Sequence, residues 1–221
     1  MIEEKYLARI KTYKENPGKF YPKDYFEMHF NRFRQWEIWA GEQFCSNLKI
    51  TSVVDLGCAV GSYLEGFLKV KCEEVKGYEY MLENSKLYTP NNVLPYILFG
   101  DLTKPLEIKK YDCALSIEVA EHLPPEYGDQ FVDNLCNASN KYIILTAAQP
   151  GQGSKRHINL QPLEFWIRKI EKKDFKLLKE KTSFFKDLFM ENIDKKYKTN
   201  DKWIYKRLKH IPNNLLIFKI K

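Results

Sequence analysis

Long apolar runs are absent from this sequence of 221 residues. The longest candidates, such as residues 142–148, have the length of a strand and fall far short of the roughly 18 residues that a membrane span needs. Residues 1–9 include acidic side chains and no apolar segment, which predicts that no signal peptide is present. We therefore expect a cytoplasmic protein with no membrane partner.

Paired cysteines are also lacking. The five cysteines are odd in number, and none of them forms a C-x-x-C pair (Cys45, Cys58, Cys72, Cys113 and Cys136). A disulfide framework or a zinc clip would show paired spacings. The pattern indicates reduced thiols, which agrees with a cytoplasmic location.

Acidic residues are scarce in the last quarter of the chain. The whole sequence carries a net charge of +7, but residues 168–221 alone carry +10 and the remainder −3. A basic segment of this kind is typical of surfaces that meet phosphates, and it is equally typical of a lysine-rich solvated face. RNA is therefore a candidate partner through this quarter.

Residues 1–48 predict a helical N-terminal extension or cap, with a break at Asn16-Pro17-Gly18. Aromatic side chains recur in it at spacings of three and four residues, which gives one apolar helical stripe (Phe26, Phe30, Phe33 and Trp36). A period of 3.6 predicts burial rather than a ligand cage, so we expect these rings in the core.

From residue 49 onward, short apolar strands alternate with helical stretches. We expect strands over residues 53–56, 75–79, 96–100, 111–117, 142–147, 175–178 and 215–220, and helices over 62–71, 126–137 and 163–173. This alternation predicts one α/β domain over 49–221, a Rossmann-like, mostly parallel sheet of seven strands with helices on both faces. Residues 179–214 are too long for a tight connection and predict a helical insert that can cover a site.

The most specific motif is the glycine turn after the first predicted strand, VVDLGCAVGSY from Val53 to Tyr63. Dinucleotide-binding turns read G-x-G-x-x-G and place a pyrophosphate on the helix N-terminus. Here the spacing is D-x-G-x-x-x-G, with Asp55 two residues before Gly57. That carboxylate would repel a pyrophosphate and suits a cationic ligand.

This turn resembles the first motif of the class I S-adenosylmethionine-dependent methyltransferases. Three landmarks follow in that family's order: Glu79 at the end of the second strand, Gly100-Asp101-Leu102 after the third, and YDCALSIE from Tyr111 to Glu118. The resemblance covers about residues 50–220. One departure is Ala59 in place of the family's middle glycine, and its methyl group would crowd the methionine part of the cofactor slightly.

The resemblance implies S-adenosylmethionine as cofactor. Asp55 would hold its ammonium group, Glu79 both ribose hydroxyls, and Asp101 the adenine amine, although Gly-Asp at a strand end is also ordinary turn chemistry. The full cofactor-binding set that it implies is Asp55, Gly57, Cys58, Gly61, Glu79, Tyr80, Asp101, Leu102 and Ser116.

A second motif, E-x-x-E-H, follows the fourth predicted strand as Glu118, Glu121 and His122. On one helical turn these side chains would share a face and suit Mg²⁺ or Mn²⁺. The segment resembles two metal-dependent branches of the family, the ubiquinone-pathway O-methyltransferases and the small-RNA terminal 2′-O-methyltransferases. The second branch adds a later histidine, here His157, so the predicted metal ligands are Glu118, Glu121, His122 and His157.

The same residues also support a reading without metal. Glu118 would then cap a helix or contact the cofactor, and His122 or His157 would be the general base. Across the two interpretations, the predicted catalytic residues are His122, His157 and Glu118.

The predicted reaction is methyl transfer to a hydroxyl oxygen of a small hydroxylated molecule, a sugar or glycan unit. The polar loop over residues 146–162 suits polyhydroxylated or anionic substrates. No Asn-Pro-Pro-Tyr or Asp-Pro-Pro-Tyr follows the fourth strand, which counts against methylation of base amino groups. The alternatives are an RNA ribose 2′-O-methyltransferase and a catalytically inactive binding subunit with a methyltransferase fold. The sequence leaves the oligomeric state open.

Overall fold

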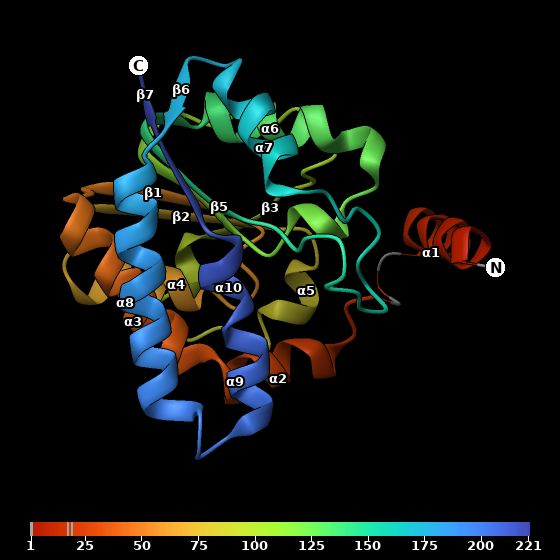
Figure 1. The fold of residues 1–221 in the computed structure, drawn as a ribbon, viewed down its shortest axis with the longest axis horizontal. Coiled ribbons are helices and arrows are strands. Elements are labelled where there is room, and N and C mark those ends of the chain that lie inside the picture. The colour runs from red at the N-terminus through yellow and green to blue at the C-terminus, as the bar shows by residue number, and fades with distance from the viewer. Residues whose placement is uncertain (1, 17, 19) are drawn as a thin grey trace.

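A seven-stranded sheet in the order β3-β2-β1-β4-β5-β7-β6 forms the centre of the computed structural model (Figure 1). The structure describes residues 2–16, 18 and 20–221, and the side chains of residues 2–6 lie outside the description. The strands are β1 (Ser52–Leu56), β2 (Glu74–Glu79), β3 (Ile97–Phe99), β4 (Tyr111–Ile117), β5 (Ser139–Thr146), β6 (Phe175–Leu177) and β7 (Leu216–Ile220). β7 runs antiparallel to β5 and β6, and the other pairs are parallel.

Helices cover both faces of this sheet, as the sequence predicted. On one face lie α3 (Arg34–Leu48), α4 (Ser62–Lys69), α8 (Lys179–Tyr197), α9 (Lys202–Leu208) and α10 (His210–Asn214). On the other lie α6 (Gly128–Asn137) and α7 (Leu163–Glu171). Val53 and Val54 of β1 point to opposite faces and both are fully buried. A strand that is apolar on both faces needs such cover, and the predicted fold is confirmed.

The strand order reverses between β1 and β4, since β2 follows β1 on one side and β4 adjoins it on the other. In open α/β sheets a crevice forms at such a switch point, outside the carboxyl ends of the strands. The glycine turn follows β1 and the E-x-x-E-H segment follows β4. The topology therefore places both motifs at the same edge.

The N-terminal region is helical, as predicted, and contains α1 (Ile2–Glu15), α2 (Lys23–Arg32) and α3. The expected break falls between α1 and α2, although Pro17 itself lies outside the described residues. Phe26, Phe33 and Trp36 are buried, as the apolar stripe predicted. Phe30 is only partly buried and lies under the Arg34 guanidinium, 5.0 Å from its ring centre.

Residues 179–214 form three helices, α8 to α10, where the sequence predicted a helical insert. Phe185 and Phe189 of α8 pack against Phe44 of α3, with ring centres 5.0 Å from it in both cases. The insert is thus part of the main core on this face. Among the described residues, no helix is long and apolar enough to cross a membrane.

The remaining elements are short. α5 (Leu82–Ser85) and the 3₁₀ turns η2 (Leu94–Tyr96), η3 (Ala120–His122) and η4 (Pro125–Tyr127) connect the larger pieces. The helix predicted over 126–137 begins as η4 and continues as α6.

Candidate functional site

The turn after β1 is held against β2 by its backbone. The N–H groups of Gly57 and Cys58 both donate to the carbonyl oxygen of Tyr78, at 2.8 and 3.2 Å. Gly57 and Gly61 have φ values of 88° and 74°, in the left-handed region that favours glycine. These two glycines are therefore required by the shape of the turn.

Ala59, which stands where the resembled family has a glycine, also has a left-handed φ of 48°. Its N–H donates to Glu79 Oε2 at 2.9 Å, and the N–H of Met81 donates to Glu79 Oε1 at 2.8 Å. Burial raises the pKa of Glu79, while these backbone donors act in the opposite direction. The Glu79 carboxylate is thus fixed at the end of β2 and keeps lone pairs for a ligand's hydroxyl groups.

Buried acids collect at this turn. Asp55 is 2% exposed, and its pKa is raised well above its ordinary value by burial and by the nearby carboxylates of Glu37 and Glu79. The hydroxyl groups of Ser62 and Tyr63 are buried and have no hydrogen-bond partner among the described residues. Such acids can accept hydrogen bonds from a ligand's ammonium group, and such hydroxyl groups can donate to its carboxylate. These residues therefore fit the amino-acid end of S-adenosylmethionine.

The other predicted cofactor residues differ in where their side chains lie. The side chains of Cys58, Leu102 and Ser116 are buried in the protein interior, and Ser116 Oγ donates to the carbonyl oxygen of Leu56 at 2.7 Å. Tyr80 is exposed. Asp101 Oδ1 accepts hydrogen bonds from the N–H and hydroxyl of Thr103 at 3.0 and 2.6 Å, so the turn chemistry weighed above is present.

The E-x-x-E-H segment does not form the single helical turn that the sequence predicted. Glu118 has a φ of 54°, and only Ala120–His122 form a 3₁₀ turn, so Glu118 leaves the shared face. Its carboxylate accepts a hydrogen bond from Asn214 Nδ2 at 3.0 Å. No helical turn begins at Glu118 because its N–H still pairs with β5 at the end of β4, where it donates to Thr146 Oγ1 at 2.8 Å.

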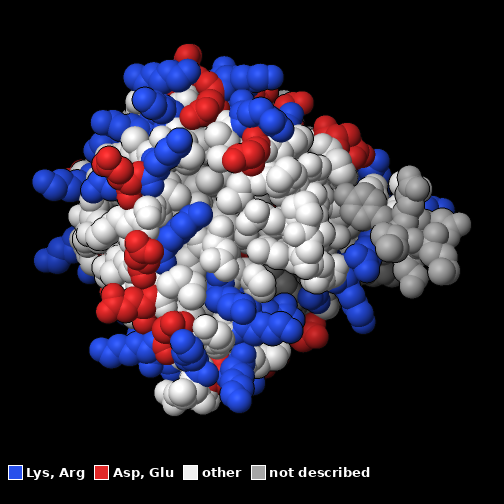
Figure 2. Space-filling view, viewed as in Figure 1, with Lys and Arg blue, Asp and Glu red and all other residues white. Residues whose placement is uncertain are grey.

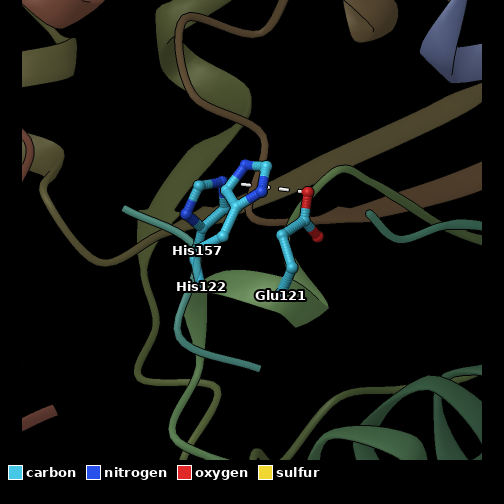
Figure 3. A group of neighbouring side chains, drawn as sticks. All are labelled: Glu121, His122 and His157. Atoms are coloured by element: carbon cyan, nitrogen blue, oxygen red, sulfur yellow. Dashed lines mark ion pairs between the residues drawn. The ribbon is translucent and has the colours of Figure 1, made fainter. Parts of the chain in front are cut away.

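Glu121, His122 and His157 come together, with one ligand atom of each within 4.8 Å of the others (Figure 3). Glu118, the fourth predicted metal ligand, is not in this group. His122 Nδ1 donates to the carbonyl oxygen of Arg156 at 3.1 Å, and His157 Nδ1 donates to that of Gln152 at 2.6 Å. Both contacts fix the tautomer and leave each Nε2 with a free lone pair.

Electrostatics at these three residues favours a bound cation. Glu121 is fully buried, and neither carboxylate oxygen has a hydrogen-bond partner among the described residues. Burial and the neighbouring Glu118 raise the pKa of Glu121 well above its ordinary value. Burial and the nearby His157 lower the pKa of His122 to about 3, and burial lowers that of His157. Neutral imidazoles beside an unpartnered carboxylate fit a divalent metal ion.

Sequence reasoning missed several residues at this edge. The ring of Tyr21 meets His122 edge to face at 5.7 Å, and the Arg156 guanidinium lies over Tyr25 at 4.8 Å. In the sequence, these two tyrosines carry no signal beyond the aromatic character of the N-terminal region. Glu37 and Asn214 carry no local sequence signal, since α3 and α10 bring them to the site by tertiary packing.

Solved methyltransferase structures share this fold. The methyltransferase domain of bacterial CtHen1 aligns over 65% of this chain and 86% of its own, with 22% identity and a TM-score of 0.52. A methyltransferase dependent on S-adenosylmethionine from Clostridium acetobutylicum aligns over 65% and 82%, with 9% identity and a TM-score of 0.53. The mitomycin 7-O-methyltransferase MmcR aligns over 73% and 55%, with 12% identity and a TM-score of 0.54.

No protein family matches the sequence, and no curated protein sequence matches it significantly. The identities to the solved structures stay below 25%. The chain thus has the fold of the class I methyltransferases, and its chemistry has to be argued from its own residues.

Proposed function

We propose that this protein transfers the methyl group of S-adenosylmethionine to a hydroxyl oxygen of a small hydroxylated molecule, a sugar or glycan unit, with help from Mg²⁺ or Mn²⁺. The observation that carries the proposal is the fully buried, unpartnered Glu121 carboxylate beside His122 and His157. An unpaired buried carboxylate is costly unless a ligand compensates it. A cation bound at Glu121 would offset the free-energy cost of burying this carboxylate.

Residues on β1 and β2 supply the cofactor side of the proposed site. Asp55 faces the ammonium group, Gly57 and Gly61 allow close approach of the backbone, and Glu79 accepts hydrogen bonds from the ribose hydroxyls. When bound, S-adenosylmethionine supplies a methyl group that is already activated by its sulfonium. The protein's task is then to align the acceptor oxygen and to handle one proton.

The histidines and the metal site handle that proton. A divalent ion at Glu121, His122 and His157 would supply positive charge that lowers the pKa of a hydroxyl group. In the reading without metal, the free Nε2 of His122 or His157 accepts the hydroxyl proton directly. A chelator distinguishes the two mechanisms, because removal of the metal ion would abolish methyl transfer only in the metal-assisted one.

Aromatic and polar side chains beside His122 would contact the methyl acceptor. Tyr21 lies against His122, and Arg156 lies over Tyr25 and donates from Nε to the carbonyl oxygen of Phe20. Arg9 donates to the carbonyl oxygen of Ser154 at 3.0 Å, which ties α1 to the polar loop. Aromatic faces with fixed polar groups suit a hydroxylated ring.

A transfer assay tests this proposal. The protein is incubated with methyl-labelled S-adenosylmethionine and a panel of monosaccharides, glycan fragments and diols, with Mn²⁺ or with a chelator. We expect labelled ether in the Mn²⁺ arm and a loss of about 100-fold in Glu121→Gln. His210→Gln, which alters a histidine outside the three-residue group, should retain activity. Label on nitrogen instead of oxygen would contradict the proposal.

RNA ribose 2′-O-methylation is the second candidate. Residues 168–221 carry a net charge of +10, and Figure 2 shows Lys and Arg side chains over the region of α8 to α10, with Asp and Glu side chains among them. Asn214 at the end of α10 bonds Glu118, so these basic helices adjoin the site. RNA affinity should then fall steeply with salt, because phosphate contacts release counterions. Undetectable RNA binding at low salt excludes this candidate.

The third reading, an inactive binding subunit, predicts binding of partners without transfer. The acid and glycine positions Asp55, Gly57, Gly61 and Glu79 are all intact, which argues against it. A protein that shows neither heat nor a thermal shift with S-adenosylmethionine would support it.

A further inference from the structure

We propose that Glu37 of α3 is a second carboxylate for the cofactor's ammonium group, so that the helical N-terminal region completes the cofactor site. The proposal rests on the proposed function, because it assigns a residue to the same cofactor. It concerns a helix that lies outside the α/β domain expected from the sequence.

The packing of α3 on α4 puts Glu37 near the glycine turn. Gly41 lies one helical turn after Glu37 on the same face of α3. A Cβ at Gly41 would lie 2.4 Å from the carbonyl oxygen of Tyr63, so α3 touches the first turn of α4 there. α4 begins immediately after Gly61. The face of α3 that carries Glu37 is therefore turned toward the cofactor turn.

Glu37 is buried without a strong partner of its own. It is 8% exposed, and among the described residues the basic side chain within ion-pair distance is His29, whose Nδ1 lies 3.6 Å from Glu37 Oε1. That distance exceeds a hydrogen bond. Surface helices seldom bury an acid in this way unless something pairs with it.

Two unpartnered hydroxyl groups belong to the first turn of α4, which follows the glycine turn. Ser62 is 2% exposed and Tyr63 is 7% exposed, and neither hydroxyl has a partner among the described residues. Burial raises the pKa of Tyr63 well above its ordinary value, and so do the nearby carboxylates of Glu37, Asp55 and Glu118. The Tyr63 hydroxyl is thus close to acids of α3 and β1, and as a buried donor without a partner among the described residues it fits a ligand's acceptor.

The ligand that fits has an amino group and a carboxylate on one carbon. Glu37 and Asp55 supply acceptors for the ammonium group, and the hydroxyl groups of Ser62 and Tyr63 supply donors for the carboxylate. The two acids come from α3 and β1, two separate elements that both precede the turn in sequence. Recognition of the amino-acid end by two segments explains why α3 is packed so closely.

Calorimetric titration with two ligands tests the inference. S-adenosylhomocysteine carries the amino-acid end, whereas 5′-methylthioadenosine shares its adenosine and sulfur but lacks that end. We expect Glu37→Gln to weaken binding of S-adenosylhomocysteine about tenfold and to leave 5′-methylthioadenosine unchanged. Glu42→Gln is the matched control, since Glu42 is on the same helix and lies 3.8 Å from Lys69 Nζ. It should change neither affinity.

The ratio of the two affinities decides the outcome, because a partly unfolded sample lowers both binding signals alike. Glu37→Asp keeps a carboxylate and should keep most of the wild-type ratio. A wild-type ratio in Glu37→Gln, or an equal loss for both ligands, overturns the inference while the proposed function stands. If the wild-type protein binds neither ligand, the proposed function itself fails.

Discussion

The carboxylate of Glu79 and the backbone N–H of Ala59 form a hydrogen bond of 2.9 Å that joins the end of β2 to the glycine turn after β1. The two landmarks are 20 residues apart in sequence, yet one carboxylate organises both. The turn and the acid at the end of β2 are therefore a single structural unit.

Removing that carboxylate should disable the cofactor site. We expect Glu79→Ala to weaken S-adenosylhomocysteine binding at least about tenfold, because it removes the ribose acceptor and frees the Ala59 N–H. Calorimetry measures the change. Glu83→Ala, at an exposed acid paired with Lys86, is the control and should bind as the wild type does. Equal affinities in all three proteins would contradict this role.

Ala59 stores strain that glycine would relieve. Its φ of 48° costs an L-residue about 1–2 kcal/mol, so Ala59→Gly should raise the free energy of unfolding by about 1 kcal/mol. Ala138→Gly, at an ordinary φ of −82°, should lower it by about 0.5–1 kcal/mol. Denaturant unfolding measures both, and destabilisation by Ala59→Gly would show that the alanine is not strained.

Asp55 should make the protein without cofactor less stable as pH rises. Burial and the facing Glu37 and Glu79 raise its pKa, so above about pH 4 the unfolded chain releases a proton that the folded chain keeps. Asp55→Asn cannot titrate and should gain stability over the wild type between pH 4 and 7, while it loses cofactor binding. Thermal unfolding against pH measures the difference.

Asp112 provides the opposite case in the same sheet. Burial acts to raise its pKa, but hydrogen bonds from Thr51 and Ser52 and the nearby Lys141 together outweigh burial and lower it. The contribution of Asp112 to the free energy of unfolding is therefore present above the pKa that this group has in the unfolded chain. It is lost as pH falls through the lower pKa of the folded protein. Asp112→Asn should therefore destabilise the protein at pH 7, and a stabilising effect there would refute the sign assigned to these groups.

The metal site should respond to each of its three members. We expect Glu121→Gln, His122→Gln and His157→Gln each to weaken Mn²⁺ binding about 10-fold or more, measured by paramagnetic relaxation of water protons. Glu118→Gln should have a smaller effect, because Glu118 is engaged by Asn214. A larger loss in Glu118→Gln than in His157→Gln would restore the ligand set that the sequence alone suggested.

The sheet and the edge that carries the glycine turn could be predicted because their signals are local. A strand, a turn and an acid at a fixed spacing suffice to place Asp55, Gly57 and Glu79 at the carboxyl ends of neighbouring strands. The E-x-x-E-H segment shows the limit of this reasoning. Its spacing suggested a helical turn, but the pairing of β4 with β5 continues to the N–H of Glu118, so Glu118 ends the strand and only Ala120–His122 form a 3₁₀ turn.

Other parts of the site depend on contacts between distant segments. Asn214 bonds Glu118 across 96 residues, and the arrival of α10 at the loop of Gln149 and Gln152 has no sequence pattern. Glu37 lies in a stretch whose aromatic period correctly predicted burial. The period gave no reason to expect a buried acid there, since burial of Glu37 follows from how α3 crosses α4.

The most direct measurement is calorimetric titration of S-adenosylmethionine, with and without Mg²⁺ or Mn²⁺, on the wild type and on a Glu121→Ala/His122→Ala variant. We expect cofactor binding in both proteins and a separate metal signal that the variant loses. Cofactor binding without a metal signal would move proton handling to an imidazole base. No cofactor binding under any condition would contradict the central claim that this chain is a methyltransferase.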